Sequence, residues 1–505
     1  MKAALGRFND FPGRLLARSC SWPASGAIAI FVAVFAVHAY FSGSSGWNQN
    51  ARVDAVLNFV EPGPDRFTYR IDSFRHDNGR DLYTDDWAMS DGHYYSNKAP
   101  GIQVWGTPAY FILYGIERLL NVDPTTHEVT RLNQYLLNLW CSTVWVAAAA
   151  VMLFAFALAS GSAAADAMVV ALAYALGTLV LPFGISVWGH STAASALLLS
   201  TCLLFWPGGV RLPLPAGLLA GFAVFVEYSA AIPVLVLSGA LVLACGSDLL
   251  RGLHGSRAPR VLARFISGGF PSLLALLVYQ KICFGGFLTS SAGQSNPALI
   301  DPDRIGGMLG AFSASVLAQN LFFPYRGLFL YCPVLLFALP GAVLAWKAGR
   351  RNLVAVAALS ITGVHALIAC HNGWWGGWST GPRYLIVCLP FWCLLLPRSR
   401  RLPGVARWVY FGCIALSVLN MIAIAAVEAM MQKRVANPLY GVIYPRLLNG
   451  RYPVMKASFN LGSAILGLPP RWDLLPFAIM VVMLGIWMWR LCRAQESLEP
   501  TEQSG

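Results

Sequence analysis

Apolar runs of about 20 residues recur along almost the whole of this 505-residue chain, and they constrain its fold more than any other feature. A helix of ~20 apolar residues can cross the ~30 Å hydrocarbon core of a membrane. Charged residues make up 12% of the chain, which is about half of the usual share in soluble domains. We therefore expect an all-α integral membrane protein with about twelve transmembrane helices between residues 24 and 492.

Basic residues predict which side of the membrane each segment faces, because lysine and arginine gather in cytoplasmic loops. The segment 1–23 is basic, and no cleavable signal peptide is evident after it. Three later basic clusters, at 251–264, 347–351 and 398–407, fall on the same side as this segment only if the apolar run 102–120 does not cross. We therefore expect 102–120 to form a helix in the membrane interface. Both the segment 1–23 and the polar tail 493–505 then lie in the cytoplasm.

This topology leaves three long outer loops, at 43–131, 284–326 and 429–471, and most acidic residues fall in them. The net charge of +13 therefore reflects orientation in the membrane, and we do not expect nucleic-acid binding. The segment 214–246 is short for two crossings. It forms either two short spans that meet at Glu227 or a re-entrant pair, and both place Glu227 at or near the outer face.

Carboxylates are concentrated in the first outer loop, and its densest part is 84–101, TDDWAMSDGHYYSNKAPG. A general base must lie near an acceptor hydroxyl, and burial or neighbouring carboxylates raise its pKa. Most acids in a loop are only solvated, and we expect Asp86 to be the main exception because it leads directly into the dense motif.

Cations at the outer ends of helices could hold a phosphate at headgroup depth, namely Lys98, Arg326 and Arg383. The alternative is that they only reach toward lipid headgroups. The indoles of 374–378 could stack on sugar rings or belong to an interfacial aromatic belt. The candidate sugar- or acceptor-binding residues are His93, Tyr94, Tyr95, His190, Glu227, Tyr228, His371, Trp374, Trp375 and Trp378. There is no HExxH or similar metal motif, so we expect no cofactor, with a divalent metal as the weaker alternative.

The segment 91–101, DGHYYSNKAPG, is similar to a DGxYYSxKxPG pattern in bacterial mannosyltransferase-like proteins. The segments 217–228, 324–327 and 374–384 match the same group. With its first span, its large acidic outer loop and two expected interfacial helices, the chain resembles the GT-C superfamily of membrane glycosyltransferases over nearly its whole length. This superfamily includes protein O-mannosyltransferases and lipid-A aminoarabinose transferases.

The resemblance implies sugar transfer from a polyprenyl-phosphate donor on the periplasmic face of a bacterial inner membrane. The acceptor would be a glycan, a lipid or a protein, an outer-loop aspartate would act as base, and basic residues would hold the lipid phosphate. Many members carry an acidic pair just after the first span, but here 47–52 reads WNQNAR. The base must then come from later in the loop, with Asp86 as first choice and Asp54, Asp72 and Asp85 as alternatives.

Two other function classes stay open. One is a transporter or flippase for lipid-linked sugars, although no internal repeat is visible and the ionisable groups gather at one face. The other is an O-antigen ligase or polymerase that uses a diphosphate-linked donor, although such enzymes lack a large acidic first loop.

Overall fold

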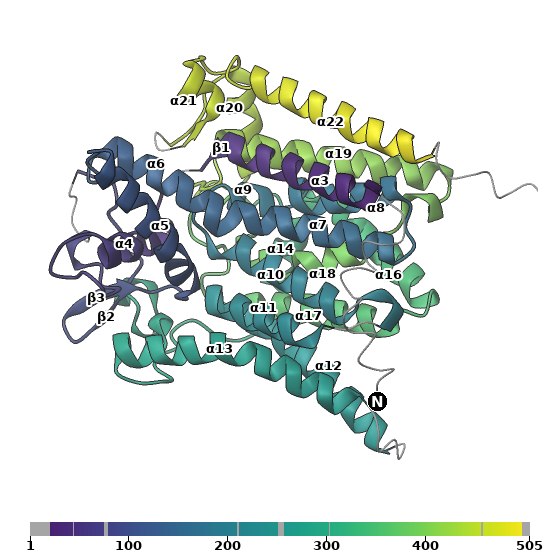
Figure 1. Cartoon of the computed structure of the whole chain (residues 1–505), viewed down its shortest axis with the longest axis horizontal. Helices are drawn as coiled ribbons and strands as arrows, with labels where there is room; N and C mark the ends of the chain where they lie inside the picture. Colours follow the sequence, from purple (N-terminus) through teal and green to yellow (C-terminus); the bar gives the residue numbers. More distant parts are fainter. Residues whose placement is uncertain are drawn as a thin grey trace, which may run out of the picture.

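The computed structural model describes residues 21–43, 45–74, 79–209, 212–250, 257–301, 303–455 and 458–496. Most of the expected cytoplasmic segments 1–23 and 493–505 lie outside these residues. The described chain is mostly helical, with short strands that form two two-stranded sheets (Figure 1).

The elements follow one another in this order. The first half contains α3 (Ser21–Tyr40), β1 (Phe41–Ser42), α4 (Trp47–Val60), β2 (Trp87–Ser90), β3 (His93–Ser96), α5 (Gly101–Leu119), α6 (His127–Asn138), α7 (Val144–Ala159), α8 (Ala164–Leu176), α9 (Val180–Gly184), α10 (Gly189–Leu204), α11 (Pro213–Val226) and α12 (Ala231–Leu250). The second half contains α13 (Ala258–Phe284), α14 (Ala314–Phe322), α15 (Leu328–Tyr331), α16 (Ala338–Lys347), α17 (Arg351–Ala369), α18 (Leu389–Leu394), α19 (Gly404–Val427), α20 (Tyr444–Asn449), β4 (Phe459–Asn460), α21 (Leu461–Leu466) and α22 (Leu475–Glu496).

Among the described residues, six helices are long and apolar enough to cross a membrane. They are His127–Ala159, Tyr228–Asp248, Ala258–Phe284, Arg351–Ala369, Gly404–Val427 and Leu475–Arg493. Shorter apolar helices occupy Ala24–Tyr40, Ala164–Leu176, Gly189–Leu204, Pro213–Val226, Pro333–Lys347 and Arg383–Leu394. The chain therefore has the helices of a multi-pass membrane protein. The helix α5, expected in the interface, is not among the six, and the uncertain segment 214–246 is divided at Glu227 into α11 and α12.

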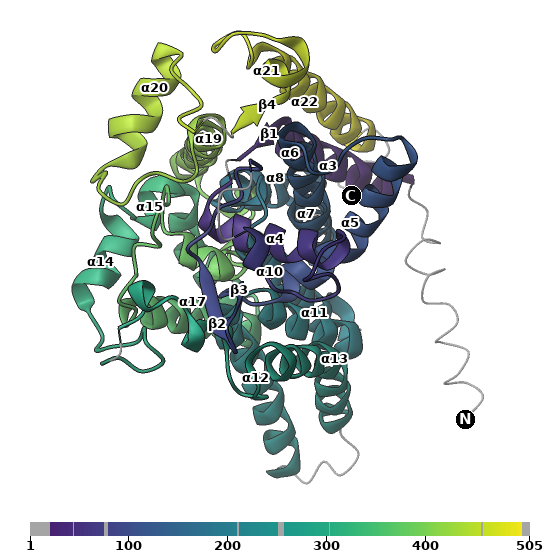
Figure 2. The ribbon, with the colours of Figure 1, turned by 90° about the vertical axis from the view of Figure 1, so that its left-hand side faces the viewer.

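The elements of the segment 43–131 lie together at one end of the helical bundle. Figure 1 shows α4, β2, β3 and α5 at its left-hand end, and Figure 2 looks onto this end. At the far end of α7, Arg350 donates to the carbonyl of Ser160 over 2.9 Å, and Arg398 donates to that of Gly161 over 2.7 Å. Two of the three basic clusters thus meet at one turn, away from the acidic loop.

The two ends of the described chain are joined beside the first loop. Strand β1 pairs antiparallel with β4, so that Phe41 faces Asn460. The hydroxyl of Tyr40 donates to the carbonyl of Asp473, and α22 runs along α3 (Figures 1 and 2). The exit of the first helix, from which the acidic loop starts, is therefore held by the last elements of the chain.

Candidate functional site

The register of the β2–β3 hairpin brings Asp86 and Lys98 together. Trp87 pairs with Ser96, and the amide of Asn97 donates to the carbonyl of Asp86 over 3.3 Å. Because the strands are antiparallel, the residues that flank this pair also lie side by side. Lys98 Nζ lies 3.0 Å from Asp86 Oδ2, and both side chains are mostly buried.

The segment 284–326 fixes the backbone at Lys98. The hydroxyl of Ser291 donates to the carbonyl of Lys98 over 3.2 Å and lies 3.0 Å from the hydroxyl of Tyr228. The amide of Asn296 bonds the carbonyl of Trp87. The loop 284–326 thus ties the hairpin to the start of α12.

Glu227 joins this region to the buried start of α10. Its Oε2 lies 3.0 Å from His190 Nδ1 and 3.9 Å from Arg52 Nη2. Burial favours the neutral acid, but the cationic side chains of Arg52 and Lys98 and the neighbouring His190 outweigh it and lower the pKa of Glu227 to about 2. Glu227 is therefore a carboxylate at neutral pH.

Arg52 is 1% exposed, and its Nη1 donates to Asn48 of its own helix. Burial lowers the pKa of Arg52 to about 10, against the opposing effect of the carboxylates Glu227 and Asp86. The neighbouring position 189 must be glycine, because a Cβ there would lie 2.8 Å from the carbonyl of Val226 and 3.2 Å from Arg52 Nη2.

Arg383 lies between aromatic faces on the other side of His190. Its Cζ is 4.7 Å from the ring centre of Trp188 and 5.2 Å from that of Tyr384, which are cation–π distances. The side chain is 8% exposed, and its Nε is buried without a hydrogen bond in the described structure. Gly376, at φ 74°, leaves room for it, because a Cβ there would lie 3.0 Å from Arg383 Cγ.

Arg326, in contrast, donates its hydrogen bonds to backbone carbonyls. It is fully buried, and its guanidinium donates to the carbonyls of Tyr325, Trp375 and Gly377. Burial lowers its pKa, and Arg383 is near enough to lower it further. Its donors hold the 375–377 loop against which Arg383 packs, so Arg326 braces the loop and does not offer its donors to a ligand.

We call Arg52, Asp86, Lys98, His190, Glu227 and Arg383 the cationic centre. Its basic side chains outnumber its carboxylates, and the braced Arg326 adds a further positive charge nearby. A buried excess of positive charge favours an anion. Arg383 offers such an anion a buried donor that the described protein does not satisfy.

The other predicted carboxylates lie elsewhere. Asp72 accepts from the amide of Tyr94 over 2.6 Å and lies 2.7 Å from His93 Nδ1, so it braces the hairpin. Asp85 accepts from Tyr83 in an exposed position. Asp54 is fully buried, and its carboxyl has no hydrogen-bond partner among the described residues; burial raises its pKa well above the usual value, which Arg80 partly opposes.

The predicted sugar-binding aromatics divide between two places. Tyr94 packs on Trp87, and Tyr95 packs on Phe284 and contacts Arg70, so both support the hairpin away from Arg383.

The histidine and tryptophans of the 371–378 loop lie nearer to Arg383. The ring of His371 is 5.4 Å from that of Tyr384, and burial, then Arg304 and Arg383, lower the pKa of His371 to about 4. Trp374 packs on Tyr325, Trp375 offers its carbonyl to Arg326, and Trp378 is 44% exposed.

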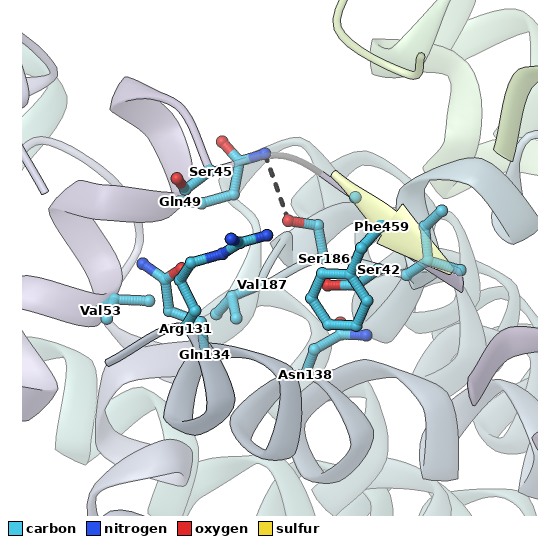
Figure 3. Close-up of a pocket in the computed structure, with 12 residues that line it drawn as sticks. Ser42, Ser45, Gln49, Val53, Arg131, Gln134, Asn138, Ser186, Val187 and Phe459 are labelled. Carbon is cyan, nitrogen blue, oxygen red and sulfur yellow. Dashed lines mark hydrogen bonds between the residues drawn. The ribbon is translucent and has the colours of Figure 1, made fainter. Parts of the chain in front are cut away.

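A small pocket is lined by residues of α4 and of the segment before α10 (Figure 3). From α4 come Gln49, three positions before Arg52, and Val53, directly after it; Ser186 and Val187 precede Trp188. The remaining lining residues are Ser42, Gly43, Ser45, Arg131, Gln134, Asn138, Ile185 and Phe459. Figure 3 shows Gln49 and Ser186 joined by their hydrogen bond across the pocket.

Within the part of the chain that the structure describes, no group of three or more His, Cys, Asp or Glu is placed to hold a metal ion. Comparison with models of protein families, with curated proteins and with solved structures finds no match.

Sequence reasoning missed Arg52 and Trp188. The sequence analysis used the segment 47–52 only to note that it lacks an acidic pair. An arginine in this segment, just after the first apolar run, was the signal that could have indicated Arg52. Trp188 directly precedes Gly189 and His190, and it resembled any other aromatic residue at a helix start.

Proposed function

We propose that this protein is a membrane glycosyltransferase that moves a sugar from a polyprenyl-phosphate donor to a periplasmic glycan, lipid or protein. The observation that carries this proposal is the cationic centre itself. Arg383 lies beside aromatic rings, and Lys98 lies beside a carboxylate between β3 and α5, at the end of the bundle that holds the acidic loop (Figure 1). A lipid phosphate brings one negative charge to such a place, and its sugar brings hydroxyls and a ring face.

In this proposal Lys98 and Arg383 hold the phosphate and stabilise the charge that develops on it as the sugar leaves. Arg326 acts indirectly, by fixing the 375–377 loop. Asp86, paired with Lys98, is the loop carboxylate nearest the reaction and the first choice for the base. When the donor phosphate draws Lys98 away, the carboxylate of Asp86 becomes available to the acceptor hydroxyl.

The proposed topology has about twelve crossings, which include the shorter apolar helices, with both termini in the cytoplasm of a bacterium. Helices shorter than ~17 residues cross where neighbouring helices and a locally thin bilayer accommodate them. The end with α4, β2, β3 and α5 then faces the periplasm, where polyprenyl-phosphate sugars are used.

The test is incubation of purified protein with a panel of synthetic polyprenyl-phosphate hexoses and pentoses, with release of prenyl phosphate measured by mass spectrometry. We expect release from at least one donor, and its loss in Arg383→Gln and Asp86→Asn proteins that remain folded. Failure of the unaltered protein to consume any donor, with membrane extract added as acceptor, would contradict the proposal.

A further inference from the structure

His190 differs from the other buried histidines in what its Nδ1 faces. In His38 and His365, Nδ1 lies 2.9 Å from a carbonyl of the residue's own helix, which only anchors the ring. In His190, Nδ1 lies 3.0 Å from Oε2 of Glu227. A carboxylate oxygen only accepts, so it holds the ring hydrogen on Nδ1 and leaves a lone pair on Nε2.

The His190 ring is also fixed in direction. It stacks on Trp188 at 5.7 Å between centres, with 24° between the planes, and meets the edge of Tyr384 at 5.9 Å. The guanidinium of Arg383 lies over the same two rings. The imidazole and the proposed phosphate ligand are therefore held by one pair of aromatic side chains, and Nε2 is buried without a hydrogen bond in the described structure.

The carboxylates of the centre are less suited to accept a proton. Asp86 is paired with Lys98 at 3.0 Å, and Glu227 is engaged by His190 and Arg52. A neutral imidazole with a fixed tautomer is the usual proton acceptor in a carboxylate–histidine pair.

We propose that His190 Nε2 takes the proton of the acceptor hydroxyl and that Glu227 is the positioning residue that makes this possible. The inference rests on the proposed function and moves the base from Asp86 to His190. The hydroxyl proton passes to Nε2 while the oxygen bonds to the anomeric carbon. The bond from that carbon to the phosphate oxygen breaks, and its electron pair leaves with prenyl phosphate, which then takes the proton back from the imidazolium.

Asp86 has a different part in this scheme. Its carboxylate, once separated from Lys98, faces the positive charge that develops on the sugar ring as the leaving group departs. Loss of Asp86 and loss of His190 are therefore both harmful, but only the second removes a group that exogenous imidazole can replace.

The experiment measures donor consumption by His190→Gly protein with and without free imidazole, on the donor that the unaltered protein uses. We expect the substitution to lower the turnover rate by about 100-fold or more. Free imidazole should then raise the rate of the variant at least tenfold. His365→Gly is the matched control, because it opens a similar buried gap on α17, and imidazole should not change its rate. Asp86→Asn should likewise show no rescue.

Two further variants control for misfolding and distinguish the role of His190 as proton acceptor from the role of Glu227 as positioning residue. His190→Gln keeps most of the side-chain volume and should remain folded and inactive. Glu227→Gln should lower the turnover rate by about 100-fold with little change in the KM for donor, because its amide can hold the ring in the other tautomer.

The proposal is overturned if His190→Gln keeps more than a tenth of the normal rate, or if folded His190→Gly protein binds donor but gains nothing from imidazole. In that case the unaltered protein still consumes donor, so the proposed function stands. If the unaltered protein consumes no donor, the proposed function fails and this inference fails with it.

Discussion

The ammonium of Lys98 lies 3.0 Å from the carboxylate of Asp86, where the β2–β3 hairpin leads into α5. The opposite charges of the two side chains offset each other. A phosphate that enters the cationic centre must compete with Asp86 for Lys98, and the following predictions start from this relationship.

Lys98→Met should weaken binding of a polyprenyl-phosphate sugar by about tenfold or more. A hydrogen bond to a charged group contributes ~1.5–3 kcal/mol, and each 1.4 kcal/mol is tenfold in affinity. Binding is measured by titration of donor into detergent-solubilised protein. The control is Lys281→Met, because Lys281 donates to the carbonyl of Gly285 of its own helix end. Equal affinities in the two variants would argue against a role for Lys98 at the phosphate.

Arg326 and Arg383 should respond differently to the same substitution. Arg326→Gln should lower the unfolding free energy by roughly 2–4 kcal/mol, because the carbonyls of Tyr325, Trp375 and Gly377 lose a buried charged donor. Arg383→Gln should change stability much less and weaken donor binding more. Thermal unfolding in detergent together with donor titration separates the two effects. If Arg383→Gln lost more stability than Arg326→Gln, Arg383 would be the residue that holds the loop, and Arg326 would be the residue that binds the donor.

Gly189→Ala should disrupt the cationic centre. Its Cβ would lie 2.8 Å from the carbonyl of Val226 and 3.3 Å from Glu227 Oε2, so α10 must shift. We expect a loss of ~1–3 kcal/mol in unfolding free energy and of most donor consumption. Gly239→Ala in α12 is the matched control, because a Cβ there meets nothing within 4 Å. If both variants behaved alike, the close approach at Gly189 would not matter.

Asp54 should make stability depend on pH. The pKa of its carboxyl is raised in the folded protein, so Asp54 ionises at a lower pH in the unfolded chain than in the folded one. Between these two pKa values, the free energy of unfolding falls as the pH rises. Asp54→Asn removes this effect. The melting temperature of the variant relative to the unaltered protein should therefore rise between pH 5 and pH 8, by an amount that corresponds to about 1 kcal/mol or more. A difference in melting temperature that stays constant between pH 5 and pH 8 would contradict the raised pKa of Asp54.

The proposed orientation predicts which cysteines an impermeant reagent can reach. In a background without reactive native cysteines, Met89→Cys on exposed β2 should be labelled in intact cells from which the outer membrane barrier has been removed. Ala348→Cys, in the exposed turn after α16, should be labelled only after the inner membrane is opened. The reverse pattern would leave the cationic centre on the side without the proposed substrate.

The helices were predictable because a long apolar run has few alternatives to a helix in a membrane. The interfacial assignment of 102–120 came from the positions of distant arginines and stays a prediction. The position of Asp86 was also predictable, because a short turn at Asp91–Gly92 sets the hairpin register that places Asp86 beside Lys98.

The rest of the centre depends on packing between segments that are far apart in sequence. Glu227 was recognisable as an ionisable group between two apolar helices, but its contact with His190 and Arg52 arises only when α4, α10 and α11 meet. The sequence likewise showed no difference between Arg326 and Arg383. They differ because the carbonyls of Trp375 and Gly377 accept hydrogen bonds from Arg326, whereas Arg383 packs against an aromatic ring.

The pairing of β1 with β4 has a consequence for biosynthesis. Ser42 and Phe459 line the same pocket, yet more than four hundred positions of the chain separate them. A ribosome must therefore make nearly the entire polypeptide before the carboxyl-terminal end of the first helix can acquire its final neighbours. Until then the nascent chain lacks one wall of this pocket.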